Sequence, residues 1–297
     1  MSNASALSDS QLVEALQADG PVPRALIDEY YRRCIPLYMD FLGVHWHTGF
    51  YSDKDAGTSP ADQVRMIDFV AGSIGLGSNE RVLDVGCGIG GTLCHLNKRY
   101  ACEAVGLTPS PEQKTIAERL ARSLNAVIQV DLGHADALPY PSASFDVVTF
   151  FESTCHFEDR AAFFREVFRI LKPGGRLAGE EWLARDLSDD KQRIRWIDPV
   201  CKSWAIPMLG DFREYRRLME SAGLIDVTIT DLKDIMALHK GFTVTKSALS
   251  ELEPKIHACP DALRRLILRG LASLGLAVNA GAFTIGHVVA KKPGHSS

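Results

Sequence analysis

The sequence of 297 residues contains no stretch that is long and apolar enough to span a membrane. Its longest stretch without Asp, Glu, Lys, Arg or His, Gly270 to Gly286, is shorter than the roughly 20 apolar residues of a membrane span and includes polar Ser273 and Asn279. The first residues also lack a basic segment followed by an apolar run, so we predict no secretory signal. We therefore expect a cytoplasmic protein with no membrane span.

An excess of basic residues is also absent. Lys and Arg number 33 against 37 Asp and Glu, which gives a formal net charge of -4 and a pI near 6.1. A protein that grips nucleic acid or anionic lipid usually has a broad basic surface, so we expect neither partner. Apolar residues make up 46% of the chain, which is enough for a large core. A small apolar substrate is the partner that this composition favours.

The seven cysteines include no CxxC pair and no Cys/His spacing typical of a zinc finger. In a reducing compartment we expect most of them to be small buried hydrophobic residues. The sequence therefore predicts no metal held by the protein.

From residue 77 the sequence alternates between strand and helix signals. Short apolar runs, near-continuous like those of a buried parallel sheet, predict strands at 81–85, 102–107, 126–130, 145–151, 176–182, 226–231 and 283–290. Amphipathic stretches between them predict helices. The pattern predicts an α/β fold, a doubly wound Rossmann-like sheet of about seven strands.

Segments outside this alternation are expected to cover the sheet. Residues 1–76 predict a helical, aromatic-rich cap, and residues 77–297 predict a core with cap insertions at about 184–209 and 233–279. Ligands of open α/β sheets bind at the carboxyl ends of the strands, where we expect these segments to lie.

Three glycines follow the first predicted strand, in Asp84-Val-Gly86-Cys87-Gly88-Ile-Gly90. Glycine lets the backbone approach a ligand more closely than any Cβ would permit. Dinucleotide enzymes carry a similar loop, but Asp84 would repel a pyrophosphate. We therefore expect this carboxylate to hold a cationic amino group.

The sequences LDVGCGIGG, VGLTPS, ALPYP and LKPGG together resemble the class I S-adenosylmethionine-dependent methyltransferases. The resemblance implies an enzyme that uses S-adenosylmethionine as its cofactor. Thr108 and His134 stand where that family commonly has acidic residues. The resemblance implies a cofactor site formed by Asp84, Gly86, Cys87, Gly88, Gly90, Thr108, Pro109, Gln113, His134, Ala135, Asp136 and Phe151.

A narrower resemblance covers Phe151 to His156 and the Glu181-Trp182 pair, which are similar to elements of sterol C-methyltransferases and of microbial prenyl and terpenoid C-methyltransferases of the teleocidin type. It implies methylation of carbon at an isoprenoid alkene through a carbocation, with cyclisation before proton loss as an option. Glu181 is the preferred base, with Glu152, His156 and Glu180 as further catalytic candidates. Aromatic side chains attract cations, so we expect Tyr31, Trp46, Trp182 and Trp204 to bind the substrate.

Other functions remain open at this stage. The chain is also compatible with an N- or O-methyltransferase of a small metabolite, and with a methyltransferase-like binding protein that has no catalytic activity. Mg²⁺ is expected only with a diphosphate substrate. The sequence leaves open which substrate is used and whether the chain forms a homo-oligomer.

Overall fold

The computed structural model describes residues 7–52, 59–185, 190–242, 254 and 261–294, and it has the predicted α/β fold. Seven strands form one sheet in the order β3-β2-β1-β4-β5-β7-β6, in which β7 runs antiparallel to β5 and β6 and the other pairs are parallel. The strands are β1 (Arg81–Val85), β2 (Glu103–Thr108), β3 (Ile128–Leu132), β4 (Phe145–Phe151), β5 (Leu171–Ala184), β6 (Ile225–Asp231) and β7 (Phe283–Lys291). The predicted doubly wound, Rossmann-like sheet is confirmed.

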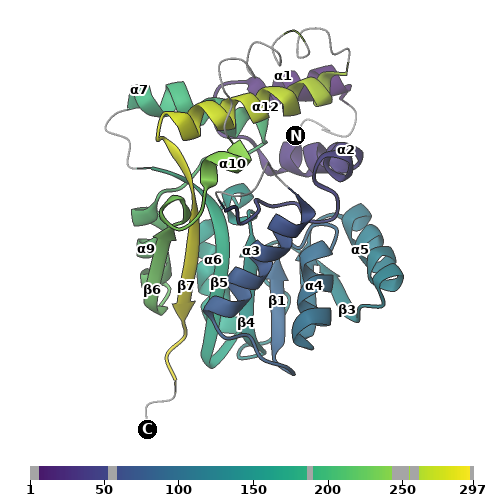
Figure 1. The fold of residues 1–297 in the computed structure, drawn as a ribbon, viewed down its shortest axis with the longest axis vertical. Coiled ribbons are helices and arrows are strands. Elements are labelled where there is room, and N and C mark those ends of the chain that lie inside the picture. Colours follow the sequence, from purple (N-terminus) through teal and green to yellow (C-terminus); the bar gives the residue numbers. More distant parts are fainter. Residues whose placement is uncertain (1–6, 53–58, 186–189, 243–253, 255–260, 295–297) are drawn as a thin grey trace.

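Helices cover both faces of this sheet (Figure 1). One face packs against α3 (Pro60–Ser73), α4 (Gly91–Tyr100) and α5 (Pro111–Leu124), and the other against α6 (Arg160–Ile170) and α9 (Phe212–Ser221). Successive strand residues point to opposite faces, so Val82 joins the first core and Leu83 the second. This alternation determines which strand residues can reach a ligand on a given face.

The segments predicted as strands differ from the structure mainly at their ends. Strand β3 lies two residues later than expected, and β5 begins at Leu171 because the chain pairs with Phe145 before its register shift. Gly174, with φ of +77°, lies inside this longer strand. The turn sequence LKPGG therefore ends helix α6 as expected but also begins the next strand.

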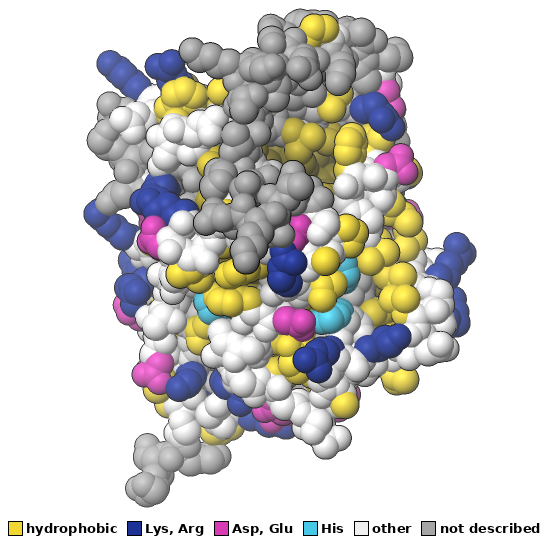
Figure 2. All heavy atoms as spheres, in the orientation of Figure 1, with side chains coloured by type: hydrophobic (Ala, Val, Ile, Leu, Met, Phe, Trp, Pro, Cys, Tyr) yellow, Lys and Arg dark blue, Asp and Glu magenta, His cyan; other side chains and the backbone are white. Residues whose placement is uncertain are grey.

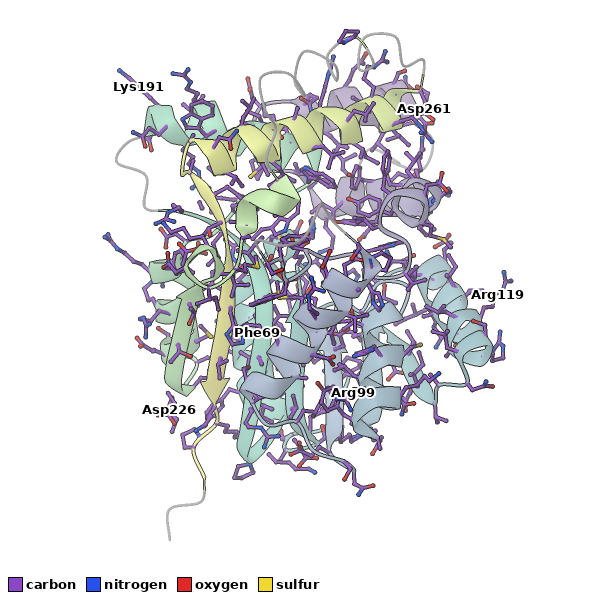
Figure 3. All side chains as sticks on the ribbon, in the orientation of Figure 1. Phe69, Arg99, Arg119, Lys191, Asp226 and Asp261 are labelled. Carbon is purple, nitrogen blue, oxygen red and sulfur yellow. The ribbon has the colours of Figure 1, made fainter. Side chains whose placement is uncertain are left out.

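A layer of helices lies across the carboxyl ends of the parallel strands (Figure 1). It consists of α1 (Asp9–Gln17), α2 (Arg24–Leu42), α7 (Asp190–Gln192), η3 (Arg193–Ile197), α8 (Asp198–Ser203), α10 (Leu238–Phe242) and α12 (Ala262–Asn279). Lys191 and Asp261 mark the two sides of this layer in Figure 3. Residues 243–253 and 255–260 of the expected insertion, and residues 186–189 of the other, lie outside the described residues. We propose that this layer is the cap, because its helices lie within residues 1–76, here called the leader segment, and within the two predicted insertions at about 184–209 and 233–279.

Short one-turn helices complete the chain, η2 (Thr154–His156) and η4 (Leu232–Asp234). No helix in the described part of the chain has the length and apolar character required to cross a membrane. Side chains of both charge signs are interspersed over the face seen in Figure 2.

Candidate active site

A cavity of about 1270 Å³ lies between the carboxyl ends of the strands and the helical layer. Its lining includes every predicted site residue except Gly90, Glu180 and Glu181. Side chains from α2, the segment after it, the ends of β1, β2 and β4, and α12 all contribute. The cavity therefore brings together the predicted cofactor and substrate regions.

The glycine loop at the end of β1 forms one wall. Gly86 has φ of +81°, and a Cβ there would lie 2.5 Å from Cβ of Ser153, so only glycine fits without strain. Gly88 also lines the cavity, and a Cβ there would lie 3.6 Å from the Trp46 ring. Gly90 does not line the cavity, because it packs against α5, where its Cβ would lie 2.8 Å from that of Ala117. Unlike the other predicted cofactor residues, Gly90 therefore lies outside the cavity lining.

Asp84 presents a carboxylate to the same wall. It is 3% exposed, and its Oδ1 accepts a hydrogen bond of 3.0 Å from Thr149 Oγ1. Burial raises the pKa of Asp84 to about 7, and the Thr149 hydrogen bond lowers it. A cationic amino group beside Asp84 would favour the ionised form.

Thr108 and Gln113 meet at the end of β2. The Thr108 hydroxyl donates to Gln113 Oε1 at 2.6 Å, and Ser110 Oγ accepts from the Gln113 N–H at 3.2 Å, which caps α5. Pro109 lies between them and also lines the cavity. Neutral hydrogen-bonding groups therefore occupy the place where the family commonly has an acid.

His134, Ala135 and Asp136 line the cavity beside the start of α2. Asp136 Oδ2 accepts from Arg24 Nη2 at 2.7 Å, and the Arg24 hydrogen bond lowers the pKa of Asp136. Arg24 also lies 3.1 Å from Glu158, so this arginine joins the helical layer to the core.

Glu152 follows β4 and is partly exposed within the cavity. Its φ of +46° is unusual for a residue with a side chain, and such strained positions cluster at functional sites. Oε1 accepts from the backbone N–H of Thr48 at 2.8 Å. Burial raises the pKa of Glu152 to about 7, while Thr48 and Trp182 lower it and Glu181 raises it. An acid with this pKa exchanges protons readily near neutral pH.

Glu180 and Glu181 lie on opposite faces of β5. Glu181 Oε2 accepts from the Thr154 hydroxyl and from the Cys155 N–H, and Thr154 in turn contacts the Tyr215 hydroxyl on the α9 side. The sequence predicts that Glu181 faces the site. In the structure the next residue, Trp182, lines the cavity. Because successive strand residues point to opposite faces of the sheet, the Glu181 side chain points away from the cavity. The expectation for Glu181 is corrected.

Glu180 shares its face with Trp182 but lies behind the cavity wall. Its side chain is fully buried, and neither carboxyl oxygen has a hydrogen-bond partner. Its Oε1 lies 3.9 Å from Nδ1 of His47. Burial, followed by the charges of Glu152 and Glu181, raises the pKa of Glu180 well above its usual value.

His156 lines the cavity together with Tyr31. Its Nδ1 lies 3.3 Å from the Ala205 carbonyl, which can only accept, so Nδ1 carries the proton. Nε2 then accepts from the Tyr31 hydroxyl at 2.6 Å. Burial lowers the pKa of His156 to about 4, so the ring is neutral.

Aromatic rings form most of the opposite wall. Tyr38 lies at the centre, with ring centroids 5.7 Å from Tyr31, 5.2 Å from Trp46 and 6.1 Å from Trp204. Trp204 contacts Trp182 at 5.5 Å in an edge-to-face arrangement. The four predicted substrate residues thus belong to one aromatic cluster, whose centre, Tyr38, sequence reasoning missed.

Residues of the leader segment were also missed. Thr48 reaches Glu152, and His47 lies 5.1 Å from the ring of Phe151. The aromatic cluster around His45 and His47 is visible in the sequence, but the backbone hydrogen bond of Thr48 has no sequence signal. Thr149, which bonds Asp84, is an ordinary strand residue by its sequence.

A family model described as "Methyltransferase domain" matches residues 83–179. The tocopherol O-methyltransferase of Arabidopsis thaliana is 32% identical over 230 residues, which are 71% of this chain and 66% of that protein. The ajmaline N-methyltransferase of Rauvolfia serpentina is 32% identical over 198 residues, 61% of this chain and 68% of that protein. The chain belongs to the class I S-adenosylmethionine-dependent methyltransferases.

The fold of this methyltransferase is also found in the crystal structure of geranyl diphosphate C-methyltransferase from Streptomyces coelicolor A3(2). The TM-score is 0.68 at 19% identity, with 91% of this chain and 97% of that chain covered. At this identity the likeness concerns the fold. The alignments with the two plant relatives span about two thirds of their lengths.

The residues of this methyltransferase fit S-adenosylmethionine. The backbone of Gly86 and Gly88 lines the cavity, a Cβ on Gly86 would collide with Ser153, and the carboxylate of Asp84 suits the amino group of the cofactor. We propose that Thr108 and Gln113 hold the ribose hydroxyls, and that His134 to Asp136 lie beside the adenine. Among the described residues no group of three His, Cys, Asp or Glu side chains is placed to hold a metal ion.

Proposed function

We propose that this methyltransferase methylates carbon at an isoprenoid alkene through a carbocation. The observation that carries the proposal is the pairing of aromatic side chains in the cavity lining with the carboxylate of Glu152, which follows β4 and lines the same cavity. The tocopherol O-methyltransferase and the geranyl diphosphate C-methyltransferase are named for isoprenoid compounds, which supports a substrate of this class.

The cofactor, when bound, supplies an electrophilic methyl group. The chain must hold the alkene carbon in line with that methyl and exclude water from the cavity. The alkene electrons would form the new C–C bond as the bond between the methyl carbon and sulfur breaks with its electron pair left on sulfur, and a positive charge would remain on the neighbouring carbon. Each aromatic face of the cluster around Tyr38 can stabilise such a cation by roughly 0.5 to 2 kcal/mol.

The cation becomes an alkene again when a neighbouring carbon loses a proton. Of Glu152, Glu180 and Glu181, Glu152 is the one that lines the cavity. The Glu181 side chain is hydrogen-bonded on the other face of the sheet, and that of Glu180 is buried behind the cavity wall. The Glu152 carboxylate takes the proton, and the C–H electrons form the new double bond. Cyclisation would insert a ring closure before this proton loss.

Incubation with methyl-labelled cofactor and a panel of prenyl diphosphates, sterols and prenylated indoles tests the proposal. We expect the label on carbon of one isoprenoid acceptor. A diphosphate acceptor would bring Mg²⁺ with it, and a chelator would then reduce turnover. Labelled nitrogen or oxygen would overturn the alkene assignment.

Methylation of nitrogen or oxygen on a small metabolite is the second candidate. The names of the ajmaline N-methyltransferase and the tocopherol O-methyltransferase favour it. The same cavity would then hold an amine or a phenol, and Glu152 or His156 would orient the acceptor or take its proton.

A further inference from the structure

The carboxylate of Glu152 is held by a residue more than one hundred positions earlier in the chain. The Thr48 backbone N–H donates to Glu152 Oε1 at 2.8 Å. This hydrogen bond favours the ionised form of Glu152 and lowers its pKa. Thr48 therefore acts on the charged form of the acid, and not only on its position.

The segment that carries Thr48 is itself fixed from α3. Gln63 is 7% exposed, and its side-chain amide donates to the His45 carbonyl at 2.5 Å and to the His47 carbonyl at 3.3 Å. The Phe50 N–H donates to the Asp62 carbonyl at 2.8 Å on the other side of Thr48. These bonds leave the Thr48 N–H with a defined direction.

The other groups that face Glu152 leave it without a cationic partner in the described part of the site. Glu180 and Glu181 approach from β5, Cys155 lies in η2, and His47 and Tyr51 lie in the leader segment. Burial lowers the pKa of His47 to about 3, so this ring is neutral. Hydrogen-bond donors must therefore stabilise the carboxylate where a charge partner is missing.

We propose that Thr48 is the positioning residue of Glu152, and that Gln63 acts through the Thr48 segment to keep the carboxylate aimed into the cavity. This assignment rests on the proposed function only for the use of Glu152 as the base. It makes the leader segment a part of the acid–base site, since residues of both the cap and the core are needed to complete it.

Infrared titration tests the assignment in the full-length enzyme with S-adenosylhomocysteine and without an acceptor. The protonated carboxyl band of Glu152 is identified by its loss in Glu152→Gln. We expect Thr48→Pro, which lacks the backbone N–H, to raise the titration midpoint of Glu152 by about one pH unit, because this donor favours the charged form. Thr48→Val keeps the N–H and should leave the midpoint in place.

A second pair of variants tests the remote residue. Gln63→Met removes the amide that holds the segment, and we expect it to raise the same midpoint. Gln129→Met removes an exposed amide of β3 that bonds Asp131, far along the sheet, and should leave the midpoint in place. The pH profile of turnover should shift with the infrared midpoint.

An unchanged midpoint in both Thr48→Pro and Gln63→Met would overturn the assignment. Because no acceptor is present, this result is independent of the reaction. A shifted midpoint in an enzyme that methylates no alkene would instead reject the proposed function and retain the positioning role.

Discussion

The hydroxyl of Tyr31 lies 2.6 Å from Nε2 of His156 and joins the helical layer to the core inside the cavity. The Ala205 carbonyl fixes the tautomer from the opposite side of the ring. Ala205 has φ of +52°, so the acceptor is supplied by a strained turn. His156 is thus held between α2 and the segment after α8.

Tyr31→Phe should reduce the free energy of unfolding by about 1–3 kcal/mol, because it leaves a half-buried imidazole nitrogen without its donor. Denaturant unfolding measures the change. Tyr140→Phe, which removes a hydroxyl bonded to Asp131 outside the cavity, is the matched control and should leave turnover unchanged. Equal turnover in the two variants would argue against a role for Tyr31 in the site.

Asp84 should make cofactor affinity depend on pH. The ionised carboxylate is needed to pair with the amino group, and the pKa of Asp84 is about 7 in the free protein. The affinity should therefore fall by about tenfold per pH unit below pH 7, and binding should release a proton. Calorimetric titration between pH 5 and 7 measures both. Asp84→Asn should bind weakly and without this pH dependence; a steep dependence in that variant would assign the effect to another group.

Glu152→Gln should retain cofactor binding but lose turnover by about 10²- to 10⁴-fold, because the cation then lacks its base. Wild-type turnover should fall below pH 7, since only the ionised acid accepts a proton and its pKa is about 7. Glu181→Gln is the comparison, because Glu181 bonds Thr154 on the other face of the sheet. A larger loss of turnover in Glu181→Gln, with both proteins folded, would return the role to Glu181.

Gly91→Ala should separate the leader segment from the core. Its Cβ would lie 2.0 Å from the Val44 carbonyl oxygen, a contact that requires the backbone to move. We expect a loss of stability of about 1–3 kcal/mol and reduced turnover. Gly72→Ala, in helix α3 with open space around it, should be neutral or more stable by about 0.5–1 kcal/mol. Thermal unfolding of the two variants compares them, and an equally stable Gly91→Ala would mean that the leader packs less closely than described.

Periodicity and glycine patterns were sufficient to predict the sheet and the position of the cofactor loop. The strand at 145–151 was predicted to the residue, since its near-continuous apolar run has one interpretation in a buried parallel sheet. The face of Glu181 could not be predicted from the same reasoning. The alternation of side chains along a strand shows that Glu180 and Glu181 point to opposite faces of the sheet. The packing of Trp182 and Tyr215 decides which of the two faces is the cavity side.

Contacts made by backbone groups were beyond the reach of the sequence. The Thr48 N–H and the Ala205 carbonyl are chemically the same in every residue, so no side-chain pattern marks them. The motif also does not distinguish the glycines that line the cavity from Gly90, which packs against α5.

The proposed reaction forms a carbon–carbon bond to an isoprenoid acceptor in this cavity. Carbon-13 NMR of the product made with ¹³C-methyl cofactor tests it most directly, because coupling identifies the atom to which the methyl group is attached. We predict one-bond coupling between the new methyl and a carbon of the acceptor when the acceptor is also labelled, and a shifted or missing product with Glu152→Gln. A methyl group bonded to nitrogen or oxygen would contradict the account.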